Sequence, residues 1–186
     1  MNRDQATQCA SLIKNARSIA VLSGAGISTN AGIPDFRGPK GLYVTKKYDA
    51  DRIFDIQYFL KDPKPFYEFA RDFIGLEQKI KPTPAHRFLA ELEGTGKLSG
   101  VITQNIDSLH QKAGSKRVYE IHGSFWESFC RDCGEKFDYA TMQEKIFVED
   151  VPRCSCGGLI KPDIVFFGEN VKFLEDSYRL AQEADV

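Results

Sequence analysis

The chain has 186 residues, of which 42% are hydrophobic and 27% are charged, and its formal net charge is -1. This length and composition fit one globular domain, or one domain with a small insert. The nearly balanced charge excludes the global basic field of many nucleic-acid-binding proteins, so we expect no direct binding to nucleic acid.

The N-terminal residues lack the charged segment followed by an apolar segment that marks a signal peptide. No apolar run approaches the ~20 residues that span a bilayer. We therefore expect no membrane association and a cytoplasmic location, or a nuclear one in a eukaryote. In these compartments the five cysteines are expected to be thiols or metal ligands rather than disulfides.

Hydrophobic spacing predicts helices and strands that alternate along the chain. The predicted helices cover residues 4–16, 49–60, 63–74, 83–97, 107–114 and 172–184. The predicted strands cover residues 18–23, 98–105, 117–123 and 163–169. This alternation favours an α/β body with a parallel sheet. Residues 125–160 differ in character, with cysteines, charges and few long apolar runs.

A glycine-rich turn follows the first predicted strand, which we expect to be buried. Gly24 and Gly26 begin this turn, and backbone N–H groups at such a position attract phosphate. The turn departs from the dinucleotide fingerprint, which has glycine where this chain has Thr29, and it lacks the Lys-Ser/Thr pair of a Walker loop. The alternative is a turn that only packs the strand against a helix.

Polar side chains lie at the end of the predicted strand over residues 98–105 and just beyond it. Gln104, Asn105 and Asp107 therefore lie at a carboxyl end of the sheet, where ligands bind in open α/β folds. An amide beside a carboxylate can hold a carboxamide, which has both donor and acceptor edges. The alternative is that Asn105 and Asp107 cap the following short helix.

His122 ends another predicted strand and could face the same cleft. Histidine exchanges a proton near neutral pH, which suits a general base. The alternative is a polar histidine whose hydrogen bonds are satisfied at the sheet edge. His86 and His110 lie in predicted helices, and we expect both to be structural.

Two close pairs of cysteines suit a closed, structural zinc site with four thiolate ligands. The pairs are Cys130 with Cys133 and Cys154 with Cys156. Zinc binding would supply folding free energy to residues 125–160, which have little core of their own. The alternative is two unrelated thiol pairs or a redox pair. Cys9 stands alone on a helix and is predicted to be a core residue.

Four segments together resemble the sirtuin family of NAD-dependent protein deacylases, in the family's order. They are GAGISTNAGIPDFRG (24–38), TQNIDSLHQKAG (103–114), EIHGSF (120–125) and KPDIVFFGE (161–169). The resemblance covers about residues 5–184. It implies a single sirtuin-type catalytic domain over residues 1–186: a Rossmann-like parallel sheet with a helical insert at about 40–82 and a small inserted zinc-binding module at about 125–160.

The resemblance implies NAD-dependent removal of acetyl groups from protein lysines, which releases nicotinamide, O-acetyl-ADP-ribose and free lysine. His122 would be the general base on a ribose hydroxyl, Asn105 and Asp107 would line the nicotinamide pocket, and Gln104 would reach the ribose. The implied NAD contacts in the glycine loop are Gly24, Ala25, Gly26, Ser28, Ile33, Asp35, Phe36 and Arg37.

Alternate residues of the predicted strand 163–169 point to opposite faces. By resemblance, Val165 and Phe167 would wall the tunnel for the acyl-lysine, while Gly168 and Glu169 would meet the substrate backbone as an added strand. The alternative is that both faces of this strand are buried in the core.

Sirtuins that remove acidic acyl groups carry a tyrosine and an arginine before the segment that matches residues 82–86. Counted back without gaps, these positions fall on Ala70 and Phe73, and neither can bind a carboxylate. We therefore expect an acetyl or another uncharged acyl group. With a gap of one residue the count would change, because Arg71 follows Ala70.

The family's later strand units, which hold the adenine and its ribose, have no match in this chain. We interpret the chain as a C-terminally truncated sirtuin, in which the sheet leaves an apolar edge exposed. Two other functions stay open at this stage: mono-ADP-ribosyl transfer from the same NAD site, and an inactive scaffold that binds NAD or zinc.

Overall fold

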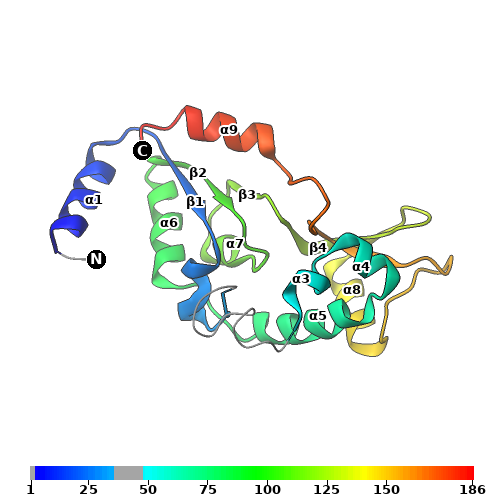
Figure 1. Ribbon diagram of the computed structural model, residues 1–186. Coiled ribbons are helices and arrows are strands. Elements are labelled where there is room, and N and C mark those ends of the chain that lie inside the picture. Colours follow the sequence, from blue (N-terminus) through cyan, green and yellow to red (C-terminus); the bar gives the residue numbers. More distant parts are fainter. Residues whose placement is uncertain (1–2, 36–47) are drawn as a thin grey trace.

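The computed structural model describes residues 3–35 and 48–186, which form two lobes around two separate sheets. The first lobe contains a parallel sheet in the order β1–β2–β3 (Figure 1). Its strands are β1 (Ile19–Ser23), β2 (Leu98–Thr103) and β3 (Val118–Glu120). The parallel sheet that the alternating pattern predicts is therefore present. Among the described residues, no helix is long and apolar enough to cross a membrane.

The described helices of the first lobe lie around its parallel sheet (Figure 1). They are α1 (Arg3–Asn15), α6 (Pro84–Gly94), α7 (Leu109–Ala113) and α9 (Leu174–Gln182), with the 3-10 helix η1 (Ala25–Ala31) after β1. Leu89 and Leu92 of α6 pack with Leu98 and Val101 of β2 in one hydrophobic cluster. Thr83 caps α6, since its hydroxyl accepts a hydrogen bond from the His86 N–H.

The second lobe combines the helical insert with the cysteine-containing module. It contains α3 (Ala50–Ile53), α4 (Ile56–Lys61), α5 (Lys64–Glu77), α8 (Tyr139–Val148) and an antiparallel sheet of β5 (Lys136–Asp138), β4 (Gly123–Cys130) and β6 (Ile160–Ile164). Phe59 and Phe66 of the insert meet Phe166, which follows β6, at ring-centroid distances of 5.2 and 5.0 Å. The two predicted inserts therefore share one aromatic core.

The predicted strand over 163–169 is wrong in its bounds and in its partner. The strand is β6, which ends at Ile164 and pairs antiparallel with β4 rather than with the parallel sheet. Beyond it, Phe167 forms only an isolated bridge with Asp55, and Gly168 turns the chain at φ +93°. The positive φ at Gly168 takes the chain out of the extended conformation of a strand.

The helix predicted over 49–60 is two short helices, because Asp55 interrupts it. The Asp55 carboxylate accepts from the N–H of Tyr58 at 2.8 Å and caps α4. A side chain that bonds the backbone in this way favours a new helix start over continuation of the previous helix.

Two burial predictions for the N-terminal segment are corrected. Strand β1 is only partly buried, and Leu22 is 67% exposed, because β1 lies at the edge of the three-stranded sheet. Cys9 is exposed instead of buried, because α1 packs on the body only near its C-terminal end, at Ile13 and Ala16.

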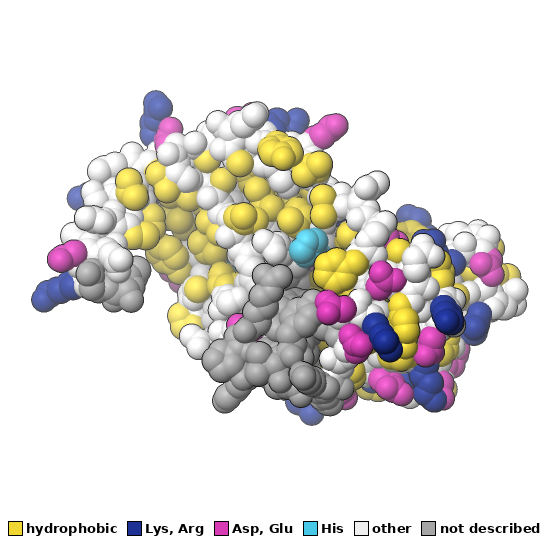
Figure 2. Space-filling view, in the orientation of Figure 1, with side chains coloured by type: hydrophobic (Ala, Val, Ile, Leu, Met, Phe, Trp, Pro, Cys, Tyr) yellow, Lys and Arg dark blue, Asp and Glu magenta, His cyan; other side chains and the backbone are white. Residues whose placement is uncertain are grey.

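On the face in Figure 2, hydrophobic side chains gather over the first lobe, and charged side chains lie mainly over the second.

Gly123 generates a stability prediction, because a side chain there meets backbone. Its φ is +70°, and a Cβ would lie 1.8 Å from the carbonyl oxygen of Asp163 in β6. Gly96 is the matched control, since its φ is +79° but nothing lies within 4 Å of its Cβ position. We expect Gly96→Ala to cost about 1–2 kcal/mol of unfolding free energy from backbone strain alone. Gly123→Ala should cost more, by about 1–3 kcal/mol of overpacking.

Urea unfolding of the two variants beside the parent protein measures this difference. Equal losses in the two variants would contradict the close packing of β4 on β6 at this glycine.

Candidate active site and metal centre

The predicted site residues meet at the carboxyl edge of the parallel sheet. Gly24 follows β1, Gln104 follows β2, and His122 lies two residues after β3. Backbone hydrogen bonds join these three loops. The Gln104 N–H donates to the Ser23 carbonyl at 3.0 Å, and the Ile121 N–H donates to the Thr103 carbonyl at 3.0 Å. The sheet thus brings the glycine loop, the amide-rich loop and the histidine to one place.

One hydrogen bond fixes the tautomer of His122. Its Nδ1 lies 2.9 Å from the carbonyl oxygen of Gln104. A carbonyl can only accept, so Nδ1 carries the proton and the neutral ring holds its lone pair at Nε2. The His122 carbonyl in turn accepts from the Val165 N–H at 2.8 Å. His122 is therefore an oriented, half-buried base between the two lobes.

Asn105 and Asp107 form a buried network with Ser28 of the glycine loop. The Ser28 hydroxyl donates to Asp107 Oδ2 at 2.6 Å, and Asn105 Nδ2 lies 3.2 Å from the same hydroxyl and 3.1 Å from the Gly24 carbonyl. Asp107 Oδ1 also accepts from the Leu109 N–H at 2.9 Å. The carboxylate therefore accepts from the first N–H of α7, from the residue before the N-cap Ser108, and also holds the glycine loop, so a contact at the helix start and the site position occur together.

Behind this network lies a second buried polar group, and two of its members, Ser23 and Thr103, were not singled out from the sequence. Ser23 donates to Thr103 at 2.9 Å and lies 2.9 Å from His110 Nε2, and the rings of His86 and His110 are 4.7 Å apart. Both histidines are buried, as expected for structural residues. Ser23 and Thr103 are the last residues of two apolar strands. A hydroxyl residue at the carboxyl end of each strand is the sequence feature that would have indicated them. This group supports the active-site loops from below.

The glycines at the start of the loop, Gly24 and Gly26, lie beside open space and are not required by close packing. Gly24 has an extended φ of -139°, which any residue adopts, and nothing lies within 4 Å of a Cβ placed on Gly24 or Gly26. Neither the backbone nor a neighbour in the described structure demands glycine there. The arrangement favours a ligand that approaches the backbone, so it fits a dinucleotide phosphate better than a packing turn.

The remaining predicted loop residues are divided between described and undescribed positions. Ile33 is buried and Asp35 is half-buried at the end of the loop, whereas Phe36 and Arg37 lie outside the described residues. Ala25 begins η1 beside the open space at Gly24 and Gly26.

The segment after β6 has one buried and one open face. Ile164 and Phe166 are buried, whereas Val165 is half-buried and Phe167 is 58% exposed. The alternative in which both faces are core is therefore not what the structure has. The Glu169 carboxylate turns back to pair with Lys161 at 2.9 Å and to accept from the Phe166 N–H at 2.9 Å. Glu169 thereby shapes the loop through its side chain.

The four cysteines come together as the spacing predicts. The Sγ atoms of Cys130, Cys133, Cys154 and Cys156 all lie within 4.8 Å of one another, and the closest pairs are 3.5 and 3.6 Å apart. A tetrahedral zinc with bonds of about 2.3 Å needs sulfur atoms about 3.8 Å apart, so the cluster fits that ion. Two of these thiols are buried and two are exposed.

The short spacing of the second cysteine pair is accommodated by glycines. The Gly157 N–H donates to the backbone carbonyl of Cys154 at 2.9 Å in a tight turn, and Gly157 has a φ of +86°. A Cβ on Gly158 would lie 2.6 Å from Cys130 Sγ. Glycine is therefore required at Gly158 for the sulfur atoms to meet.

The comparisons with known proteins agree with this geometry. The Sir2 family model matches residues 24–186. The chain belongs to the Sir2 family. An NAD-dependent protein deacetylase of Thermotoga maritima is 49% identical over 161 residues, which cover 86% of this chain and 64% of that protein. The chain thus spans less than two thirds of the length of this Sir2-family relative.

Solved structures of Sir2 proteins share the fold. One Sir2 enzyme superposes with a TM-score of 0.91 at 39% identity, covering 100% of this chain and 74% of the other. A Sir2 variant with deacetylated p53 peptide and 3′-O-acetyl ADP-ribose superposes with a TM-score of 0.85 at 45% identity, covering 96% of this chain and 72% of that one. The Rossmann-like assignment from sequence is confirmed.

The cysteine cluster predicts that Cys156→Ser lowers bound zinc far below about one ion per chain, because three thiolates bind less tightly than four. The Cys9→Ser protein should keep full zinc, since Cys9 is exposed and outside the cluster. Elemental analysis measures the ion, and thermal unfolding with and without a chelator measures its effect. Full zinc in Cys156→Ser would contradict the four-thiolate site.

The buried His110 predicts a loss of stability in acid. Burial, and to a smaller degree His86, lowers the pKa of His110 to about 4. The unfolded chain binds this proton near pH 6.5, so between these values unfolding takes up a proton and stability falls as pH falls. The loss is about 1.4 kcal/mol per pH unit from this one group.

Urea unfolding at pH 6.5 and 5 should therefore show a smaller loss in His110→Asn than in the parent protein. Equal losses in the two proteins would mean that His110 does not remain neutral in the folded state.

Proposed function

We propose that this Sir2-family chain is an NAD-dependent protein-lysine deacetylase. The observation that carries the proposal is His122, whose Nδ1 proton is committed to Gln104 at 2.9 Å and whose Nε2 is left to accept a proton. This base lies at the sheet edge that also holds Asn105, Asp107 and the open glycine loop. The relative from Thermotoga maritima, named as an NAD-dependent protein deacetylase, supports the same activity.

The residues of the sheet edge fit the parts of NAD. When bound, NAD supplies an electrophilic sugar carbon with nicotinamide as its leaving group. The space at Gly24 and Gly26 accommodates the phosphates against backbone N–H groups. Asn105 uses its amide nitrogen on Gly24 and Ser28, which leaves its side-chain carbonyl to accept from the nicotinamide carboxamide. Ser28 holds Asn105 and Asp107 in this orientation.

His122 acts as the general base at Nε2. It takes the proton from a ribose hydroxyl, and the Gln104 carbonyl stabilises the imidazolium because it already accepts from Nδ1.

The substrate is an acetylated lysine of a protein. Val165 and Phe167 form the open face of the segment next to His122, and the Val165 N–H is bonded to the His122 carbonyl at 2.8 Å. The Sir2 structure with deacetylated p53 peptide and 3′-O-acetyl ADP-ribose supports a peptide substrate and an O-acetyl-ADP-ribose product. Gly168 and Glu169 extend this segment toward the peptide backbone.

The acyl group is uncharged. Ala70 is fully buried and Phe73 packs on the aromatic core, so neither offers a charge to an acidic acyl group. Arg71 donates to the carbonyls of Ile146 and Glu149 at 3.0 and 3.1 Å, at the end of α8. This guanidinium is therefore committed to structure, which supports acetyl over succinyl or malonyl groups.

Zinc has a structural role in this proposal. The four cysteines complete a tetrahedral shell, so no position is left open for a reacting water. The ion stabilises the module that carries β4 and β6, and β6 leads directly into the substrate segment.

Replacement of the base tests the proposal. His122→Ala should lower the rate of acetyl-peptide deacetylation by at least about 100-fold, because loss of general base catalysis costs 10²–10⁴-fold. Binding of the peptide, measured by fluorescence anisotropy, should change by less than about threefold, since the side chain acts on the proton rather than on the peptide. Cys9→Ser is the control variant, and the Thermotoga maritima relative is the control enzyme.

Mass spectrometry of the peptide with and without NAD reads the products. Loss of one acetyl group only with NAD is the expected result. An ADP-ribosylated peptide would favour ADP-ribosyl transfer instead. Undiminished deacetylation by His122→Ala would contradict the role of this base.

A further inference from the structure

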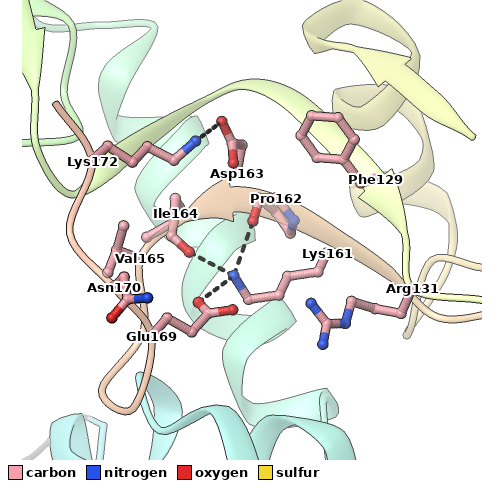
Figure 3. A pocket seen from close by; sticks show the side chains of 10 residues that line it. All are labelled: Phe129, Arg131, Lys161, Pro162, Asp163, Ile164, Val165, Glu169, Asn170 and Lys172. Atoms are coloured by element: carbon pink, nitrogen blue, oxygen red, sulfur yellow. Dashed lines mark hydrogen bonds and ion pairs between the residues drawn. The ribbon is translucent and has the colours of Figure 1, made fainter. Parts of the chain in front are cut away.

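A polar pocket of about 230 Å³ lies beside the proposed substrate segment, on the side of β6 (Figure 3). The end of β4 and the adjoining Arg131 form one wall, β6 forms the floor, and the loop through Glu169 and Asn170 forms the opposite wall. Val165 lines the pocket too, and its N–H is bonded to the His122 carbonyl. The pocket therefore adjoins the segment that carries the acyl-lysine in the proposed function.

Four of the five charged side chains that line this pocket are committed to each other. Lys172 pairs with Asp163, and the Lys161 ammonium lies 2.9 Å from the Glu169 carboxylate. Lys161 is almost fully buried, donates to the Ile164 carbonyl at 2.6 Å and lies 4.2 Å from the centre of the Phe166 ring. Its burial lowers the pKa of the Lys161 ammonium, which the Glu169 carboxylate opposes. These four groups hold the loop and have no charge left over.

Arg131 is the fifth charged group, and it is the surplus cation of the pocket. Its side chain is exposed, and within residues 3–35 and 48–186 no carboxylate pairs with it. Figure 3 shows the Arg131 guanidinium turned toward Lys161 and Glu169, with Asn170 on the opposite wall. Three cations and two carboxylates leave a net charge of one positive unit in the pocket.

We propose that Arg131 makes this pocket a specificity site for an acidic side chain, an Asp or Glu near the acyl-lysine in the protein substrate. The proposal rests on the proposed function, since it places the acyl-lysine peptide along the segment from Val165 to Glu169. A guanidinium binds a carboxylate through paired N–H donors, and the Asn170 amide supplies a further donor.

The charge of the pocket favours a carboxylate over a phosphate. One surplus positive charge matches one carboxylate, whereas a phosphate carries nearly two negative charges and would meet the carboxylates of Asp163 and Glu169. A pocket for phosphoserine would use several free arginines or lysines, and the two lysines here are already paired.

A peptide-binding experiment tests the site. Labelled acetyl-lysine peptides without other charges carry Glu, its neutral match Gln, or phosphoserine at each of the three positions on either side of the acetyl-lysine. Their binding to the zinc-loaded protein is measured by anisotropy at low ionic strength. The same peptides are measured with Arg131→Gln and with the control Lys116→Gln, which removes an equal charge from an exposed site outside the pocket.

In at least one position, we expect the Glu peptide to bind about fivefold tighter than the Gln peptide. This preference should be the same in the parent protein and in Lys116→Gln. Arg131→Gln should reduce this preference to less than about twofold, and added salt should weaken it in the parent. No preference at any position, an unchanged preference in Arg131→Gln, or tighter binding of phosphoserine than of Glu would overturn the proposal. So would a lack of binding of every peptide.

Turnover of the Gln peptides with NAD is recorded separately. Turnover without a charge preference would overturn the specificity site and leave the proposed function standing. A preference that depends on Arg131, without turnover of any peptide, would support the site and contradict the deacetylase proposal.

Discussion

The hydrogen bond from His122 Nδ1 to the Gln104 carbonyl is the interaction on which the rest of the site depends. It joins the loop after β3 to the loop after β2, and those strands are neighbours in the parallel sheet. Because the acceptor is a carbonyl, the bond selects one tautomer and leaves the basic nitrogen open. The sheet and the site chemistry are thus linked through a single backbone group.

The glycine loop and the amide-rich loop depend on the same sheet edge. The Ser28 hydroxyl accepts a hydrogen bond from the Asn105 amide and donates one to the Asp107 carboxylate. This one hydroxyl therefore ties the loop after β1 to the loop after β2. An unpaired buried carboxylate would cost about 1–3 kcal/mol or more, which makes this network fix both loops together.

Local patterns in the sequence were sufficient to predict the parallel sheet, the cysteine cluster and the approach of Asn105, Asp107 and His122. Long-range pairing was not predictable in this way. The strand β6 (Ile160–Ile164) contains Pro162, which weakens a strand signal, and only its pairing with β4 sets its bounds. The exposure of Cys9 and the surplus charge of Arg131 depend on which elements pack together, which no short window of sequence records.

The protonation of the two His122 ring nitrogens tests the central claim most directly. Nitrogen-15 NMR of the histidine rings, with His122 assigned by comparison with His122→Ala, distinguishes the tautomers at neutral pH. The account predicts a proton on Nδ1 and a bare Nε2. A proton on Nε2, with Nδ1 bare, would contradict the bond to Gln104 and remove the proposed base from its role.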